Sequence, residues 1–221
     1  MNVRVLITAL KTDKPVKENA SMLRGYIGNK FKENIILHHH VGGNESLYAY
    51  PRIQYKIIEN TPIIVGIEEG VEILKNISDG LKELILGRSR YKILSIQMNQ
   101  LNAEFGKCRE NIKYRFLLPW LALNQENYKK YKEINDWKEK KKFLNGILIG
   151  NILSMCKSLD YIVAGKLYSH SLLNEEIVKY KGIFHTTFTG EFRINFKIPD
   201  YLGIGKGVSH GFGTIKRVKN D

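Results

Sequence analysis

The chain has 221 residues, of which 43% are apolar and 26% are charged. This composition is typical of a globular protein with a substantial core and excludes a disordered or fibrous chain. The 35 Lys and Arg residues outnumber the 22 Asp and Glu residues, giving a formal net charge of +13. Such an excess predicts an anionic partner, although charge alone does not distinguish RNA from DNA, an anionic lipid or an acidic protein.

The sequence argues against a membrane, secretory or redox role. The first ten residues lack the basic region, apolar run and cleavage site of a secretory signal. The most apolar stretch, at 146–156, is shorter than the roughly 20 residues that a membrane-spanning helix needs. Cys108 and Cys156 lie far apart in no CxxC or Cys-His spacing, which argues against a disulfide scaffold or a zinc site. We therefore expect a cytoplasmic protein with no membrane partner.

The first half predicts strands and helices in a ferredoxin-like order. Residues 2–10 alternate and are rich in Val, Leu and Ile, as in a strand, whereas residues 18–31 carry apolar side chains at helical spacing. Residues 50–58 also alternate, which predicts a half-buried strand whose polar face carries Arg52, Gln54 and Lys56. The elements expected here are strands at 2–10, 35–40, 50–58, 63–67 and 91–99, and helices at 18–31 and 70–86.

The second half also combines strands with a helical region, which is long and lysine-rich and lies at 125–159. Strands are expected at 112–118, 161–164, 182–188, 191–198 and 214–218, with a hairpin turn at 189–190. Together the elements predict an α+β fold of two tandem ferredoxin-like (RRM-like) domains with antiparallel sheets, at 1–90 and 91–221. The first domain holds 13 basic and 10 acidic residues, and the second holds 22 and 12, so most of the excess charge lies in the second.

The segment GIGKGVSHGFG at 203–213 contains five glycines and a lysine. Backbone without Cβ atoms can approach a ligand closely and present N–H groups, with Lys206, to phosphate oxygens. A dinucleotide-binding GxGxxG motif is excluded because Val208 stands where the third glycine is needed, and a Walker loop is excluded because no GK[ST] occurs. A plain glycine-rich turn between strands is the structural alternative. Candidate RNA contacts are Gly203, Gly205, Lys206, Gly207, His210, Gly211 and Gly213, together with Arg52.

Three consecutive histidines form the second candidate site. On a strand, His38 and His40 project to one face about 6.5 Å apart, whereas His39 projects to the other. Because histidine titrates near neutral pH, such a pair can deprotonate a ribose 2′-OH and protonate the leaving 5′ oxygen of a phosphodiester without a metal. We assign proton transfer to His40 and His38, orientation to Tyr48, and charge balance to Lys30.

Other interpretations of these side chains stay open at this point. Tyr50 and His39 are alternative participants, and the histidines could be structural; a metal site is disfavoured because only two of them share a face. The lysines of 129–142, interleaved with Tyr128, Tyr131 and Trp137, fit either a solvated helix face or an RNA contact.

The segment at 203–213 matches the C-terminal glycine-rich signature of the CRISPR-associated endoribonucleases that process repeat-containing precursor RNA, the sixth Cas family. LRGYIGNKF at 23–31, LHHH at 37–40 and YPRIQYKII at 50–58 resemble the N-terminal domain of the subtype-B branch of that family. The resemblance implies tandem ferredoxin-like domains and metal-independent attack by the 2′-OH. The implied products carry a 2′,3′-cyclic phosphate and a 5′-OH.

The resemblance also implies the partners. The expected ligand is CRISPR repeat RNA within precursor crRNA, bound through basic surfaces and the glycine-rich loop, with no cofactor. Other Cas effector-complex subunits and a second copy of the chain are further candidate partners. A protein that binds repeat RNA without cutting it, and a metal-dependent nuclease, are the competing hypotheses.

Overall fold

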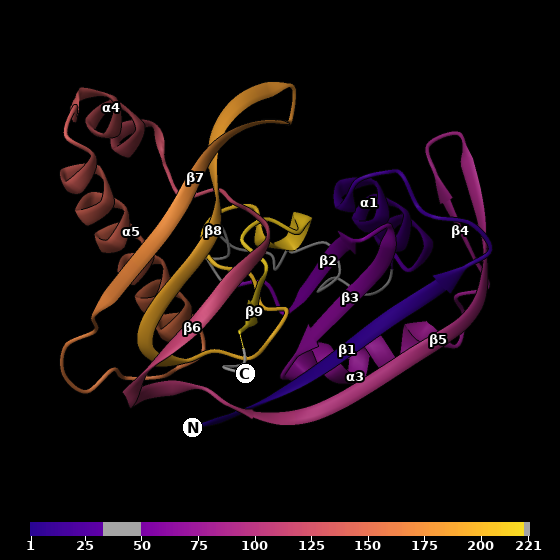
Figure 1. Ribbon diagram of the computed structural model, residues 1–221. Coiled ribbons are helices and arrows are strands. Elements are labelled where there is room, and N and C mark those ends of the chain that lie inside the picture. The colour runs from indigo at the N-terminus through magenta and orange to yellow at the C-terminus, as the bar shows by residue number, and fades with distance from the viewer. Residues whose placement is uncertain (33–49, 219–221) are drawn as a thin grey trace. The chain divides into compact units, whose positions relative to one another are not determined.

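The computed structural model describes residues 1–32 and 50–218, which fall into two compact units (Figure 1). The N-terminal unit consists of Asn2–Glu104 together with Val208–Gly211, and the C-terminal unit of Met1, Phe105–Gly207 and Phe212–Asp221. Residues 91–104 belong to the N-terminal unit because they pair with its first strand. The sequence placed the domain boundary earlier, near residue 90.

The N-terminal unit contains one five-stranded antiparallel sheet of order β2-β3-β1-β5-β4. With a helix after β1 and another after β3, the order β2-β3-β1-β5 is that of a ferredoxin-like domain, and β4 extends its edge. The predicted strand at 35–40 lies outside the described residues. The elements are β1 (Asn2–Thr12), α1 (Ala20–Lys30), β2 (Ile53–Ile58), β3 (Thr61–Ile67), α3 (Glu69–Ser78), β4 (Glu83–Leu86) and β5 (Ser89–Glu104).

The core of this unit brings apolar side chains of α1 and α3 together with those of the sheet. Leu23 and Ile27 of α1 and Leu74 of α3 are fully buried with Leu6 and Tyr55 from the strands. The predicted helix at 70–86 is wrong in its second half, because α3 ends at Ser78 and residues 83–86 form β4. Asp79 and Gly80 interrupt the helix, and the chain then pairs with β5.

The C-terminal unit contains a four-stranded antiparallel sheet of order β7-β8-β6-β9. This is again the ferredoxin-like order, with the glycine-rich segment in place of the second helix, so the predicted α+β fold with two tandem antiparallel domains is confirmed. The elements are β6 (Gly106–Trp120), α4 (Gln125–Glu133), α5 (Trp137–Ser158), β7 (Ser169–Tyr180), β8 (Ile183–Lys197) and β9 (Ile215–Arg217); a 3-10 turn, η2 (Val208–His210), belongs to the N-terminal unit.

The hairpin of the C-terminal unit differs from the prediction. β8 runs unbroken through Gly190, and the turn lies at Lys181 and Gly182, both of which have positive φ. Gly190 is required for close approach between strands, because a Cβ there would lie 2.3 Å from the carbonyl oxygen of Leu172. β7 was not predicted, since its adjacent acidic residues break the alternation, and residues 161–164 form no strand.

Aromatic side chains dominate the core of the C-terminal unit. Trp120 stacks on Phe116 with ring centroids 5.5 Å apart, and Phe116 in turn contacts Phe192. The indole N–H of Trp120 donates to Asn151 Oδ1 of α5 at 3.1 Å, which ties this helix to the sheet. Among the described helices, none has the length and apolarity needed to cross a membrane.

Candidate functional site

Three of the four predicted catalytic side chains fall outside the part of the chain that the structure describes. His38, His40 and Tyr48, together with the alternative His39, belong to residues 33–49. That segment joins α1 to β2, which contact each other in the N-terminal unit. Tyr50, the other alternative, is described and is almost fully buried at the entry to β2. The assignment of catalytic roles therefore stays a prediction.

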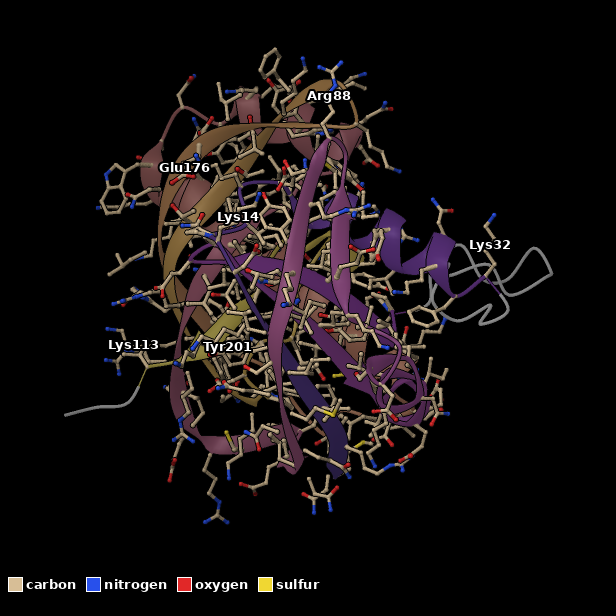
Figure 2. The ribbon with its side chains drawn as sticks, turned by 90° about the vertical axis from the view of Figure 1, so that its right-hand side faces the viewer. Lys14, Lys32, Arg88, Lys113, Glu176 and Tyr201 are labelled. Atoms are coloured by element: carbon tan, nitrogen blue, oxygen red, sulfur yellow. The ribbon has the colours of Figure 1, made fainter. Side chains whose placement is uncertain are left out.

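Lys30, the fourth candidate, lies in the last turn of α1, two residues before Lys32, which Figure 2 shows at the end of that helix. Its Nζ lies 5.8 Å from the ring centroid of Tyr26 and 5.9 Å from that of Phe31. Aromatic rings attract an ammonium group without neutralising it. Among residues 1–32 and 50–218, no acidic group pairs with Lys30. Lys30 therefore lies beside two aromatic rings, three positions before the segment 33–49 in the sequence.

Arg52, a predicted RNA contact, is tied to α3. Its Nε donates to Glu69 Oε1 at 2.7 Å, and its carbonyl oxygen accepts a hydrogen bond from the N–H of Ile67. Gly70 permits this approach, since a Cβ there would lie 2.2 Å from the Arg52 carbonyl oxygen. The side chain is only partly exposed, so an RNA phosphate at Arg52 would have to compete with Glu69.

The polar side of β2 is buried, and the prediction of a half-buried strand is wrong. Gln54 and Lys56 have no exposed surface, and Lys56 Nζ donates to Gln54 Oε1 at 3.0 Å. Burial disfavours the charged amine and lowers the pKa of Lys56 to about 7. η2 packs against β2, so the edge of this sheet is covered by a segment that is remote in sequence.

The glycines of the 203–213 segment are explained first by packing within the segment. Gly205 has a φ of +91°, and a Cβ there would lie 2.6 Å from Trp120 Nε1. Gly213 has a φ of +65°, and its Cβ would lie 1.9 Å from the carbonyl oxygen of Ile204. Any larger side chain at these two positions would push the segment off the aromatic core.

Several backbone donors of the same segment are already engaged. The N–H groups of Ile204, Lys206 and Gly213 donate to carbonyl oxygens of Gly213, Leu121 and Pro119. A phosphate cradle built from those N–H groups would break these bonds. The side chain of Lys206 is exposed, whereas the residues on either side of it are at least partly buried. An RNA contact at this segment is thus best supported at Lys206.

His210 is held by α1 within the N-terminal unit. Its Nδ1 lies 2.9 Å from Ser21 Oγ, and its Nε2 contacts Arg24 Nη1. Because arginine only donates, Nε2 accepts and Nδ1 carries the hydrogen, which points to Ser21 Oγ. Both ring nitrogens thus have protein partners, so in this conformation His210 anchors η2 to α1, leaving no ring nitrogen for an RNA ligand.

A basic surface covers the helix-free face of the C-terminal sheet. Lys113 and Arg115 of β6 lie directly opposite Arg193 of β8 and Lys216 of β9, respectively, so the four side chains share one face (Lys113 is labelled in Figure 2). Glu191 is the acidic residue among them and pairs with Lys113 and Arg115, each at 2.7 Å. These two cations hold the pKa of Glu191 below its usual range.

Sequence reasoning missed this basic surface although a signal was present. Residues 112–116 alternate between apolar and basic side chains, which places their basic members on one face. Only the strand order shows that β8 and β9 add basic side chains to that same face.

The contacts of the lysine-rich helices are those of a solvated surface rather than of an RNA-binding one. Lys130 pairs with Glu126 at 2.7 Å, and Lys132 pairs with Glu175 of β7 at 3.3 Å. Exposed pairs of this kind are common on solvated helix faces and contribute little to stability. The hypothesis of an RNA contact there gains no support from these contacts.

Comparison with known proteins agrees with this architecture. The sequence profile of the Cas6b N-terminal domain matches residues 1–104, and that of the Cas6b C-terminal domain matches residues 106–218. The chain belongs to the Cas6b family. The two profiles meet where the first unit ends at Glu104.

Individual relatives support the assignment to Cas6b. A crystal structure of Cas6b is 39% identical in sequence and covers 99% of this chain and 100% of its own, with a TM-score of 0.89. A crystal structure of a CRISPR RNA processing endoribonuclease Cas6b is 35% identical with the same coverage and a TM-score of 0.78. An uncharacterised protein of Methanocaldococcus jannaschii is 47% identical over 149 residues, which is 67% of this chain and 98% of that protein.

Proposed function

We propose that this Cas6b protein is an endoribonuclease that cuts CRISPR precursor RNA within the repeat and so releases mature guide RNAs. The observation that carries the proposal is the 35% identity, over 99% of the chain, to a CRISPR RNA processing endoribonuclease. The net charge of +13 is typical of proteins that bind nucleic acid. Its site of action would be the cytoplasm.

The chemistry that we propose is attack by the ribose 2′-OH on the adjacent phosphorus. One of His38 and His40 removes the 2′-OH proton, and the other protonates the leaving 5′ oxygen. The bond from phosphorus to the 2′ oxygen forms as the bond to the 5′ oxygen breaks, giving a 2′,3′-cyclic phosphate and a 5′-OH. Tyr48 orients the phosphate, and the positive charge of Lys30 stabilises the extra negative charge of the transition state. No metal or cofactor takes part.

RNA binding is assigned mainly to the C-terminal unit. Lys113, Arg115, Arg193 and Lys216 form a cluster of exposed or partly exposed cations suited to contacts with RNA phosphates. Lys206 and the glycines at 203, 205, 207, 211 and 213 give a second contact, in which the glycines shape the loop and the lysine meets phosphate.

Incubation of the protein with repeat RNA tests the proposal. One substrate is unmodified, and the other carries a single 2′-deoxyribose immediately upstream of the cut. We expect the first to be cut in the presence of EDTA and the second to be bound but left intact.

Three outcomes would contradict it. Cleavage of the deoxy substrate would exclude the 2′-OH as nucleophile, and loss of cleavage in EDTA would favour a metal-dependent nuclease. Tight binding of the unmodified repeat without any cleavage would leave an RNA-binding protein that is not an enzyme.

A further inference from the structure

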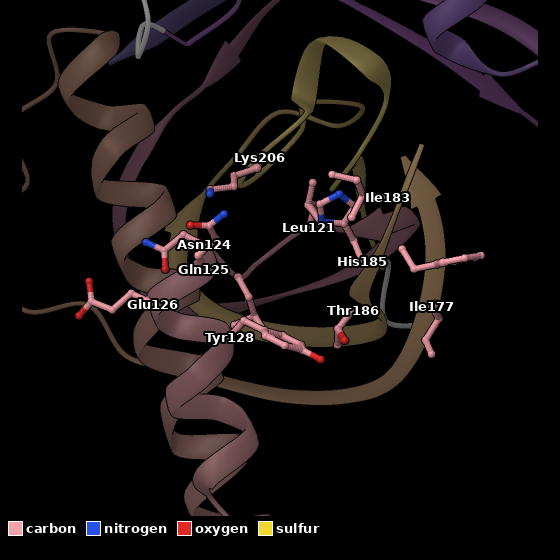
Figure 3. A pocket seen from close by; sticks show the side chains of 12 residues that line it. Leu121, Asn124, Gln125, Glu126, Tyr128, Ile177, Ile183, His185, Thr186 and Lys206 are labelled. Carbon is pink, nitrogen blue, oxygen red and sulfur yellow. The ribbon is translucent and has the colours of Figure 1, made fainter. Parts of the chain in front are cut away.

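A pocket of about 860 Å³ lies in the C-terminal unit, and of its lining residues only Lys206 has a role in the proposed function (Figure 3). Its wall comes from the first turn of α4, the turn end of the β7–β8 hairpin, and Lys206 of the glycine-rich segment. Figure 3 shows Lys206 at one end of the hollow and Tyr128 of α4 at the other. Pockets that hold small organic ligands measure roughly 300–1,000 Å³, so this one is large enough for a nucleotide.

The apolar part of the wall is unusually exposed. Ile177 is 72% exposed, Ile183 is 64%, Phe184 is 71% and Tyr128 is 42%. These four residues, from the hairpin and from α4, line the same pocket. A group of large apolar side chains that stays in water on a folded protein usually marks a binding site.

One ammonium group lies close to each of the two aromatic rings, and that of Lys132 also pairs with Glu175 at 3.3 Å. Lys132 Nζ lies 5.6 Å from the ring centroid of Tyr128, and Lys179 Nζ lies 5.8 Å from that of Phe184. Lys206 adds a third ammonium group to the pocket wall. Aromatic faces stack on bases of any sequence, and neighbouring cations hold the phosphate, as in sites for single-stranded nucleic acid.

Polar groups complete the wall. The Oδ1 atom of Asn124, a residue of the wall, accepts from the N–H of Asn127 at 2.6 Å as the cap of α4, so the amide NH2 group is the part of this side chain that can donate to a ligand. Gln125 and Thr186 offer further donors and acceptors for the edge of a base. Glu126, the acidic group of the wall, is paired with Lys130 at 2.7 Å, so it does not repel an anion with its full charge.

We propose that this pocket binds one unpaired nucleotide of the RNA, with its base among Tyr128 and Phe184 and its phosphate at Lys206. The nucleotide has to be unpaired, because a base within a helix cannot enter a pocket. This inference rests on the proposed function, since the nucleotide belongs to the RNA that the protein processes.

Binding of a non-cleavable 2′-deoxy repeat RNA to single variants, followed by fluorescence anisotropy, tests the pocket. Tyr128→Ala and Phe184→Ala should each weaken binding by about 10- to 100-fold, the usual loss for one stacked base. Tyr168→Ala is the matched control, because Tyr168 is 60% exposed and has Lys166 Nζ 5.4 Å from its ring centroid but lies outside the pocket. Tyr168→Ala should bind like the wild type, and Tyr128→Phe, which keeps the ring, should too.

RNAs in which one base at a time is removed provide the second measurement. For the wild type, removal of the base at one unpaired position should weaken binding as much as Tyr128→Ala does. In the Tyr128→Ala variant, removal of that same base should cause no further loss of affinity. The proposal would be overturned if the pocket variants bound like Tyr168→Ala, or if base removal and Tyr128→Ala weakened binding independently. The pocket would then be assigned to another ligand, such as an apolar peptide. A wild-type protein that neither binds nor cuts the repeat would instead refute the proposed function.

Discussion

Two strands of the molecule have nearly the same alternation of apolar and polar residues, but the polar side is buried in one and exposed in the other. Residues 53–57 read IQYKI in β2, and residues 112–116 read IKYRF in β6. In both, the apolar and aromatic side chains face the core of their unit. The polar side of β2 is fully buried and includes Lys56, whereas the polar side of β6 keeps Arg115 60% exposed.

The difference shows that alternation predicts which residues share a face but not whether that face meets water. β2 contacts η2, which comes from about 150 residues further along the chain, and its lysine is left with an amide as partner. The helix-free face of β6 stays accessible and is joined by cations from β8 and β9. We therefore assign RNA binding to the second face and ascribe no phosphate contact to the first.

The largest effect should come from the pair of histidines that the N-terminal unit contributes. His38→Ala combined with His40→Ala removes both proton-transfer groups, each of which contributes about 10²- to 10⁴-fold to the rate of such reactions. Single-turnover cleavage should fall below detection while the affinity for repeat RNA stays near the wild-type value. Persistent cleavage would place the catalytic groups elsewhere, and a matching loss of affinity would show that these histidines bind RNA.

Lys56→Met should stabilise the protein. Below pH 7 the lysine is charged in the folded and the unfolded state, so the full cost of burying the charge opposes folding. Between about pH 7, the folded-state pKa, and about pH 10.4, the unfolded-state pKa, the unfolded chain holds more protons, so wild-type stability rises with pH. The variant should exceed the wild type by about 2–4 kcal/mol at pH 7 in the free energy of unfolding, and the gap should close towards pH 10.

Denaturant unfolding at several pH values measures this gap. Arg115→Met is the matched control on the exposed strand, and its stability should change little at any pH, because exposed charges cost little to keep. A gap that did not depend on pH would mean that Lys56 is not buried as a titrating amine.

Local sequence patterns predicted the elements of the fold, whereas features that depend on contacts between distant residues could not be predicted. The ferredoxin-like order was predictable because β1, α1 and β5 have clear periodicity. The end of α3 and the β7–β8 hairpin were not, since local patterns there were ambiguous and strand pairing decided the outcome. The motif at 203–213 could be found from its glycines, but the partners of His210 could not, because Ser21 and Arg24 are almost 190 residues away.

The exposed face of the C-terminal sheet should control affinity. Replacing Lys113, Arg115 and Lys216 together by Gln should weaken RNA binding by about 10- to 100-fold near physiological salt and lower the slope of log affinity against log salt by about 2–3. The cutting rate of bound RNA should remain unchanged, because these residues are assigned to binding and the histidines to proton transfer.

A control variant that also loses three positive charges distinguishes an effect of this surface on affinity from an effect of the total charge. It replaces three exposed, ion-paired cations of the N-terminal unit by Gln: Arg4, Lys75 and Arg90. Equal losses in the two triple variants would show that affinity depends only on total charge and would remove the contrast between the two faces.

The smallest effect should come from the acidic residue on the basic surface. Glu191→Gln frees Lys113 and Arg115 from their ion pairs, so repeat RNA should bind a few-fold more tightly. Because those cations hold the pKa of Glu191 below its usual range, the carboxylate stays ionised in mild acid, and the gain should be the same at pH 5.5 as at pH 7. Glu72→Gln, which removes ion pairs to Arg4 and Lys75 on the other unit while Arg4 keeps its pair with Glu68, should leave affinity unchanged. Weaker binding by Glu191→Gln would mean that its two ion pairs hold Lys113 and Arg115 in the orientation that RNA requires, which would make the carboxylate a positioning residue.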